Sequence, residues 1–370
     1  AIASYEWMAA ITLIIVGKFF LPIFIEKKIY TIPEYIEKRY NTTLKTILAI
    51  FWIFLFVFVN LTTVMFLGAK ALDTIMGTGD GSLLIPAMIG LACVAAAYSL
   101  DGGLSAVAWT DVIQVILLVL GGIITTIIAL DYVTPEGGVF AGLGHIYDQA
   151  GDKFHRILTK DNPEFSNLPG IAVLIGGMWI ANLYDWGFNQ YIIQRTLAAK
   201  SLKEAQRGLA FAAFLKLIIP LIVVIPGIVA FVMFAQPEGT ALIEGAREAF
   251  AKADGGVNYD KAYPWLISTF IPTGLKGIVV AALTAAIISS LASMLNSTAT
   301  IFTMDIYKPY FAKEKSEKRL VNVGRITAAV ALVIALIVAP LLKSLPQVFQ
   351  YIQEYTGLVS PGVLAVAMLG

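Results

Sequence analysis

Five charged residues stand inside long apolar stretches of this sequence: Glu6, Lys18, Asp111, Asp185 and Lys216. A charged side chain at the centre of a membrane-spanning helix costs about 2.5–3.5 kcal/mol on insertion scales, so each one marks a candidate functional position. Lys18 lies near the end of its stretch, where its long side chain can reach the lipid headgroups. We therefore interpret Lys18 as structural.

Glu6 and Lys216 are the deepest of these charges. They could form a mutual ion pair that holds two helices together, or line a polar substrate pocket, which is the interpretation we favour. Asp111 follows Ala108-Trp109-Thr110 near a span end. It could cap the start of a helix, because acidic side chains favour the first turn, or it could attract cations. Both alternatives stay open for Asp111.

Neutral polar side chains are mixed with aromatic rings in two other stretches. These are Asn182-Leu183-Tyr184-Asp185-Trp186-Gly187-Phe188-Asn189-Gln190-Tyr191 and Phe349-Gln350-Tyr351-Ile352-Gln353-Glu354-Tyr355-Thr356-Gly357. Amides supply hydrogen-bond donors and acceptors, and aromatic rings supply flat apolar faces, a mixture that suits a sugar. We expect the helix over 171–193 to be interrupted and to line a water-filled cavity, although interfacial aromatic residues are the alternative. Ser360-Pro361-Gly362 allows a break in the second stretch as well.

Small and hydroxyl-bearing residues follow one face of a third stretch. Ala286, Ser289 and Ser290 lie at i, i+3 and i+4, and Ser293, Ser297 and Thr300 continue close to that face. Such a stripe is typical of tight helix packing. Hydroxyls with a backbone carbonyl also form the oxygen-rich site that small hard cations such as Na⁺ prefer.

The amino-acid composition indicates which kind of structural element holds these residues in place. Of 370 residues, 58% are hydrophobic and 14% are charged, against about 45–50% and about 25% in soluble proteins. This excludes a soluble enzyme and a disordered chain, and a net charge of +1 provides no basic surface for nucleic acid. An all-α membrane protein remains, because lipid requires backbone groups to be satisfied within each segment. We expect nine spans: 2–25, 46–68, 83–100, 108–131, 171–193, 208–235, 270–304, 322–342 and 348–370.

The loops suggest one membrane domain with a defined orientation. Most Lys and Arg residues outside the spans fall in 26–45, 194–207 and 305–325, which predicts a cytoplasmic position for these loops. The sequence contains no Walker loop, HExxH or CxxC motif, so neither a primary pump nor an enzyme is expected. The chain begins and stops inside apolar stretches, and we expect it to be part of a longer protein.

Three stretches together resemble the sodium/solute symporter family. They run over Tyr98–Asp111, over Phe188–Arg195 and over Ser289–Tyr307. The resemblance is strongest to bacterial sugar-transporting members and extends nearly from end to end. It implies a five-plus-five inverted-repeat fold with broken helices. Residues 1–131 would belong to the first repeat and 170–370 to the second, without the first broken helix and the C-terminal helices.

The resemblance also implies roles for individual residues. Those implied to bind sugar are Glu6, Asn182, Trp186, Lys216 and Gln353, with Tyr5 and Phe349 as the outer gate. The Ala286 carbonyl and the hydroxyls of Ser289 and Ser290 would bind Na⁺, and Asp111 would lie on the ion's exit path. Asp185 departs from the pattern, since galactose-transporting members have a tyrosine there that stacks on the sugar. A carboxylate can still accept sugar hydroxyls, so Asp185 remains a candidate substrate-binding residue.

The function expected from these observations is sodium-coupled import of a galactose- or glucose-like sugar by alternating access. Its partners would be the sugar, the sodium ion and the lipid bilayer, in the inner membrane of a bacterium. A sodium symporter for another small solute, such as an amino acid, a vitamin or sialic acid, is the first alternative. A non-transporting sugar sensor or a channel-like protein on the same scaffold is the second.

Overall fold

The computed structural model describes most of the chain, and its regular elements are all helices. The described residues are 3–77, 80–99, 103–134, 137–155, 157, 159–161, 165, 170–235, 241–251, 258–311, 316–345 and 348–369. Within them, seven helical segments are long and apolar enough to cross a membrane: Ser4–Glu26, Thr42–Met76, Asp111–Val133, Leu202–Ala235, Thr273–Phe311, Glu317–Ser344 and Tyr351–Leu369. They correspond to seven of the nine expected spans.

The other two expected spans differ from a regular crossing helix. The span at 83–100 contains α6 (Leu84–Ala97), a 14-residue apolar helix. It passes into π-helical turns at Tyr98 and Ser99, and the described residues resume at Gly103. The span at 171–193 is interrupted, as the sequence predicts, and carries the candidate site. Near the C-terminus the allowed break does not occur, because α17 (Val348–Leu369) continues through Pro361 as one helix.

Three spans contain a π-helical turn between two α-helices. They are α1 (Ser4–Ile15) to α2 (Leu21–Glu26) through Val16–Phe20, α4 (Thr42–Leu55) to α5 (Thr62–Met76) through Phe56–Leu61, and α14 (Thr273–Ile301) to α15 (Lys308–Phe311) through Phe302–Tyr307. A π-helical turn inserts an extra residue and shifts the face that the following helix presents; such turns are frequent at functional sites.

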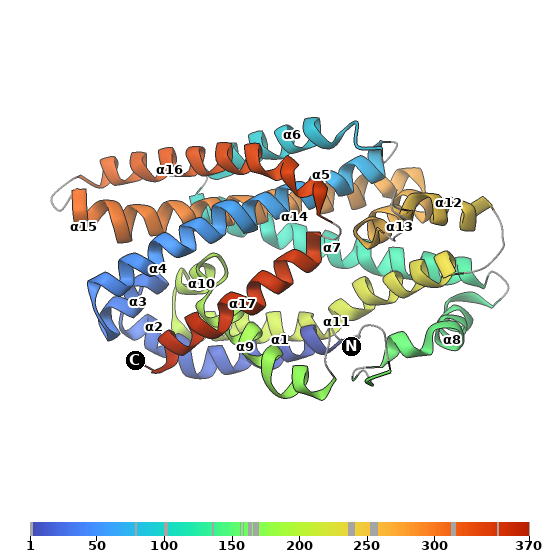
Figure 1. Ribbon diagram of the computed structural model, residues 1–370, viewed down its shortest axis with the longest axis horizontal. Coiled ribbons are helices and arrows are strands. Elements are labelled where there is room, and N and C mark those ends of the chain that lie inside the picture. The colour runs from blue at the N-terminus through green and yellow to red at the C-terminus, as the bar shows by residue number, and fades with distance from the viewer. Residues whose placement is uncertain are drawn as a thin grey trace.

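The long helices run along the molecule between two ends of different character (Figure 1). At one end lie α2, α3 (Ile32–Arg39) and α15. The segments rich in Lys and Arg, 26–45, 194–207 and 305–325, fall in this part of the chain, and we call it the basic end. At the far end lie three short helices, α8 (Gly138–Ala150), α12 (Ala241–Phe250) and α13 (Ala262–Phe270). Short 3₁₀ turns extend them or join neighbours: Gly151–Phe154, Tyr259–Lys261 and Ala339–Ser344.

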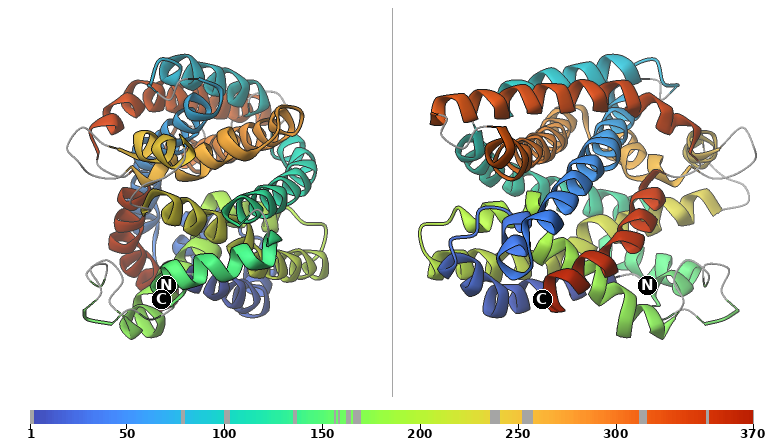
Figure 2. Two further views of the ribbon diagram at one scale, coloured as in Figure 1. Left: turned by 90° about the vertical axis from the view of Figure 1, so that its right-hand side faces the viewer. Right: turned by 60° about the vertical axis from the view of Figure 1, so that its left-hand side comes forward.

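The helices form two groups bridged by one long helix. In one group, α5 and α6 pack on α14 and α16 (Glu317–Val338). In the other, α1 packs along α11 (Leu202–Ala235) and α9 (Met178–Leu183), and Figure 2 shows the two groups on opposite sides of the bundle. The long helix α7 (Gly103–Val133) contacts both α14 and α11. Each of these two apolar cores combines residues from both halves of the sequence.

The last turns of α17 are attached to α3 at the basic end. The Tyr35 hydroxyl donates to the Ala367 carbonyl at 3.1 Å, and the Tyr40 hydroxyl donates to the Val366 carbonyl at 3.0 Å. Arg39 also donates to the Ala367 carbonyl, at 2.6 Å. Two helices more than 300 residues apart in the sequence are therefore joined by side chains that contact backbone.

Candidate functional site

The interrupted segment consists of four short pieces. A π-helical turn at Val173–Gly177 leads into α9, and a second one at Tyr184–Phe188 follows it. Asn189 then adopts extended backbone angles (φ −88°, ψ 117°) before α10 (Gln190–Leu197) begins. An extended residue breaks the ladder of helical hydrogen bonds, and such backbone is tolerated at membrane depth where it is buried in protein or lines a cavity. The predicted interruption is confirmed, and it lies at Asn189.

One face of this segment contacts the charged pair singled out in the sequence. The Lys216 ammonium donates to Glu6 Oε2 at 2.6 Å and lies 4.5 Å from the centroid of the Trp186 ring. The Trp186 indole donates to Asn182 Oδ1 at 3.2 Å, and the Asn182 amide donates to the Met178 carbonyl. Four of the expected sugar-binding residues are thus brought together on α1, α9, α11 and the π-helical turn that follows α9.

Both alternatives for Glu6 and Lys216 find support in this cluster. The ion pair joins α1 to α11, and its side chains are 21% and 15% exposed. Removing one partner of a buried pair typically costs about 3–5 kcal/mol, because the other charge is left uncompensated. The pair therefore holds two helices, and at the same time the Trp186 ring contacts it from the interrupted segment.

Residues of the same segment also line a small cavity of about 170 Å³. Asp185, Tyr5 and Gln353 all border it. The Asn189 amide donates to Asp185 Oδ1 at 3.0 Å, so the residue at the break holds the carboxylate in place. Drug-sized ligands occupy pockets of about 300–1,000 Å³, so this cavity matches a smaller solute.

A larger cavity of about 840 Å³ lies toward the basic end, between α2, α10, α14 and α16. Amides and hydroxyls border it together with one guanidinium: Gln190, Gln194, Asn296, Thr300, Thr303 and Arg325. The Thr303 hydroxyl and the Asn296 amide nitrogen are buried and find no hydrogen-bond partner among the described residues, so they remain available to a polar solute or to water.

The hydroxyl stripe on α14 divides into two kinds of residue. The hydroxyls of Ser297 and Thr300 donate to carbonyls one turn earlier in their own helix, as expected for packing. The Ser289 hydroxyl instead donates to Asp111 on α7, and Ser293 accepts from Arg195. Ala286 and Ser290 lie half-buried on the same helix. Of the three predicted sodium residues, Ser289 therefore makes a polar contact with other helices.

Asp111 does not cap a helix. Because α7 begins at Gly103, Asp111 lies more than two turns inside it, and the capping alternative is wrong. Its carboxylate accepts from Ser289 and forms an ion pair with Arg195 at 3.1 Å. Of the two expected gate residues, Tyr5 borders the small cavity, whereas the side chain of Phe349 lies outside the described residues.

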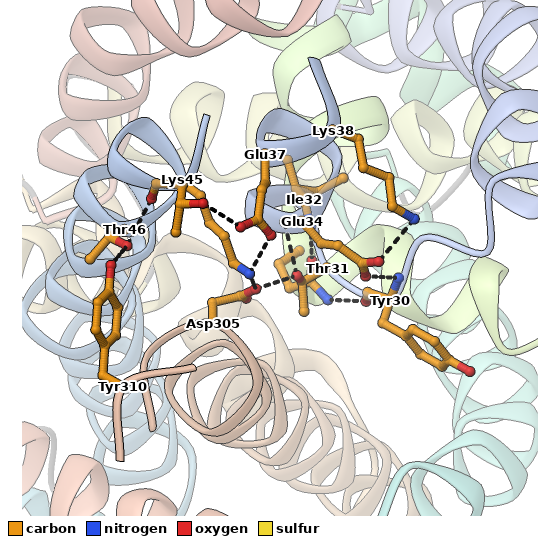
Figure 3. Close-up of polar contacts among 12 residues, drawn as sticks. Tyr30, Thr31, Ile32, Glu34, Glu37, Lys38, Lys45, Thr46, Asp305 and Tyr310 are labelled. Atoms are coloured by element: carbon orange, nitrogen blue, oxygen red, sulfur yellow. Dashed lines mark hydrogen bonds and ion pairs between the residues drawn. The ribbon is translucent and has the colours of Figure 1, made fainter. Parts of the chain in front are cut away.

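A second charged cluster, which sequence reasoning missed, joins α3 and α4 to the segment before α15 (Figure 3). Lys45 donates to Glu37 Oε2 at 2.6 Å and lies 3.5 Å from Asp305 Oδ1, which also accepts from Thr31 at 3.0 Å. Thr42 donates to the other oxygen of Glu37. Burial raises the pKa of the Glu37 carboxyl, but the hydrogen bonds and charge of Lys45, with the Thr42 hydrogen bond, outweigh burial and hold it below its ordinary value. Lys45 and Asp305 lie near the ends of their spans. From the sequence alone, a charge at such a position is expected to face the lipid headgroups, so it does not stand out.

The broken helix, the paired charges and the hydroxyl stripe are the features that led us to expect a membrane transporter, and comparisons with known proteins give its class. The pattern of the Sodium:solute symporter family matches residues 1–370, and the chain belongs to this family. It is a multi-pass membrane protein. The expected transporter fold is confirmed by a solved Na⁺-coupled sialic acid symporter in a substrate-bound, outward-open state. That structure is 25% identical, with a TM-score of 0.79, and the match covers 100% of this chain and 71% of the symporter.

Individual relatives narrow the class further. The chain is 62% identical over 370 residues to a sodium/glucose cotransporter of Vibrio parahaemolyticus, covering 100% of this chain and 67% of the relative. It is 32% identical over 385 residues to sodium/myo-inositol cotransporter 2 of Bos taurus, covering 100% of this chain and 55% of that protein. The chain thus spans about two thirds of the first relative and about half of the second.

Proposed function

We propose that the protein is a sodium-coupled symporter that imports a neutral sugar by alternating access. The observation that carries this proposal is the charge-balanced cluster of amide, indole and ion pair on an interrupted helix, in a chain that belongs to the sodium:solute symporter family. The 62% identity to a sodium/glucose cotransporter supports a hexose as the substrate.

The ion pair between Glu6 and Lys216 indicates whether the site favours a sugar or an anionic solute. A carboxylate substrate needs a free cation in the site, and Lys216 is the cation of this cluster. Its ammonium lies 2.6 Å from Glu6, so its charge is already compensated. An anion would have to displace Glu6, whereas hydroxyl groups can both donate to Glu6 and accept from Lys216 while the pair persists. The site thus favours an uncharged polyol over sialic acid or an amino acid.

We assign the site residues accordingly. Residues that hydrogen-bond the sugar are Glu6, Asn182, Asp185, Lys216 and Gln353. Trp186 supplies an apolar ring face, and Tyr5 with Phe349 closes the outer side. For Na⁺, the Ala286 carbonyl and the hydroxyls of Ser289 and Ser290 supply neutral oxygens, and Asp111 lies on the exit path. Na⁺ held mainly by neutral oxygens binds weakly enough to leave.

The order of the helices supports the two-repeat assignment. Residues 1–131 contain spans in the order α1–α2, α4–α5, α6 and α7. After the interrupted helix, the second half contains α11, α14–α15, α16 and α17 in the same order. The second pair, Thr42–Met76 and Thr273–Phe311, are the longest spans of their halves, with 35 and 39 residues, and each contains a π-helical turn. We therefore propose that 1–131 and 170–370 are parts of the two inverted repeats.

The two cavities supply a route. The small cavity borders the interrupted helix, and the larger one opens toward the basic end, which the positive-inside rule places in the cytoplasm. Sugar would pass from the first to the second when the helix groups rearrange. One inward Na⁺ supplies about 2.3 kcal/mol per 100 mV of membrane potential, which can drive accumulation.

Uptake of labelled sugars by the full-length protein in proteoliposomes tests the proposal. We expect galactose or glucose to accumulate with an inward Na⁺ gradient and not with a K⁺ gradient. Accumulation of sialic acid or an amino acid in place of sugar would assign the protein to another solute. Sugar binding without Na⁺-driven accumulation would identify a sensor, and either result would overturn the proposal.

A further inference from the structure

Arg195 is a cation held against the oxygens that border the predicted sodium route. Its Nη1 atom lies 3.1 Å from Asp111 Oδ2 on α7. Its Nη2 atom donates to the hydroxyls of Ser289, at 3.3 Å, and of Ser293 on α14. One guanidinium thus contacts a carboxylate and two hydroxyls on two different helices, a geometry that the planar fork of arginine allows and a lysine ammonium does not reproduce.

Ser289 is shared between this contact and the predicted ion site. Its proton points to Asp111, so its oxygen lone pairs are the groups that accept from Arg195. A Na⁺ ion bound by Ser289 needs one of those lone pairs, and it would also lie beside a guanidinium of the same sign. Arg195 and Na⁺ therefore compete for the same oxygen, and Asp111 can neutralise either of them.

Arg195 is well anchored to the interrupted segment. It lies on α10, which begins directly after the break at Asn189, and the Asn189 amide holds Asp185. Gln194, its neighbour on α10, donates to the Ser293 carbonyl at 3.2 Å. A movement of Arg195 away from Ser289 would therefore also displace α10 and, through it, the segment that forms the proposed sugar site.

We propose that Arg195 is a positioning residue that acts as a tethered substitute for Na⁺. In the ion-free protein it neutralises Asp111 and occupies the hydroxyls of Ser289 and Ser293; Na⁺ binding displaces it, and the displacement is transmitted through α10 to the sugar-binding segment. This inference rests on the proposed function for its biological meaning, but the competition itself concerns Na⁺ binding alone.

The test is Na⁺ binding by the purified full-length protein, measured with radioactive ²²Na⁺ in the absence of sugar. Arg195→Gln removes the competitor, so the half-saturating Na⁺ concentration should fall roughly five- to tenfold, within the usual range of couplings between sites. Arg195→Lys keeps the charge but loses the fork, and should lie between the two. Arg207→Gln, which breaks an exposed pair with Glu204, is the matched control and should leave Na⁺ binding unchanged.

Transport adds a readout that a merely structural role would not move. Net uptake requires the ion-free carrier to return, whereas sugar exchange at equal Na⁺ on both sides does not. Arg195→Gln should therefore lose most net uptake while keeping exchange, because Asp111 is left without a cation in the return step.

An unchanged or weaker Na⁺ affinity in Arg195→Gln and Arg195→Lys overturns the inference, as does a parallel loss of exchange and net uptake. If Arg195→Gln does not fold, the Na⁺ affinity of Arg195→Lys decides. A wild-type protein that binds Na⁺ without transporting sugar would overturn the proposed function but leave the Arg195 comparison decisive. A wild-type protein that binds no Na⁺ would overturn both.

Discussion

Two charged clusters on the α14 span look alike in composition and differ in burial. In the cluster of Figure 3, Lys45 pairs with Asp305, and their side chains are 8% and 2% exposed. In the other cluster, Arg195 pairs with Asp111, and the exposed fractions are 39% and 20%. The first pair is enclosed by Glu37 and Thr31, whereas the second is partly exposed at the start of the Asp111–Val133 span, where we expect water to reach it. A charge pair closed off from water serves to hold helices, and one that water can reach is able to exchange its cation.

The largest expected effect is a loss of stability in the enclosed cluster. If this loss were absent, the proposed difference between the two clusters would be wrong. Lys45→Gln leaves Asp305 buried without its cation, so we expect a loss of about 3–5 kcal/mol. Arg195→Gln leaves a carboxylate that water reaches, so we expect a loss of about 1 kcal/mol or less. Thermal unfolding in detergent measures both, with Arg207→Gln as the exposed control. Equal losses in the two variants would show that burial does not distinguish the clusters.

The pair between Glu6 and Lys216 extends the comparison to a case of intermediate burial. Glu6→Gln or Lys216→Met should raise the half-saturating sugar concentration by roughly tenfold, equal to about 1.4 kcal/mol. The reason is that each change removes a group that hydrogen-bonds the sugar and leaves its partner uncompensated.

Sugar-dependent uptake in proteoliposomes gives the value. Lys18→Met is the control, since that lysine is exposed on the same span as Glu6. If the pair only joins helices, stability falls and the sugar dependence of the remaining uptake is unchanged.

A smaller effect is expected at Asp185, which borders the small cavity at the position where the family resemblance implies a stacking tyrosine ring. Asp185→Tyr supplies that ring, and a stacked aromatic contact is worth about 0.5–1.5 kcal/mol, so galactose affinity should rise between about two- and tenfold. Asp185→Asn keeps the size without the charge and separates stacking from hydrogen bonding. Competition of galactose against labelled glucose measures the change. Identical affinity and transport in Asp185→Tyr would contradict a substrate-binding role for this position.

The smallest effect is a pH dependence confined to the enclosed cluster. The pKa of Glu37 in the folded protein lies below the ordinary value of 4.5 because of Lys45 and Thr42. A lowered pKa in the folded state adds stability above the ordinary pKa, and this contribution is lost as pH falls through the folded pKa. The difference in unfolding temperature between the wild type and Glu37→Gln should therefore be largest near pH 7 and shrink below about pH 4. A constant difference would place the stabilisation elsewhere.

The charges inside membrane spans could be identified from the sequence, because the free-energy cost of such a charge depends on the apolar residues around it in the chain. Glu6 and Lys216 stand out in apolar runs, and the structure joins them; the interruption near Asn189 follows from a polar and aromatic stretch too poor for a lipid-facing helix. Span lengths were harder, since a short apolar run such as 83–100 does not show how far its helix continues.

What the sequence could not provide was the pairing between distant helices. Lys45 and Asp305 are 260 residues apart and lie near span ends, where a charge normally costs little. Arg195 is one basic residue among several in its loop, and its contact with Asp111 exists only once α7, α10 and α14 are brought together. Long-range electrostatic contacts follow from packing, and no local pattern records them.

The attachment of α17 to α3 has a mechanical consequence. Side chains of Tyr35 and Arg39 on α3, and of Tyr40 directly after it, contact the carbonyls of Val366 and Ala367 and so join the two helices at the basic end. We expect a swing of α17 to carry α3 with it, and through α3 the end of α2. Under the proposed alternating access, we expect fewer independent motions than the number of helices suggests, because helices far apart in the sequence would move together.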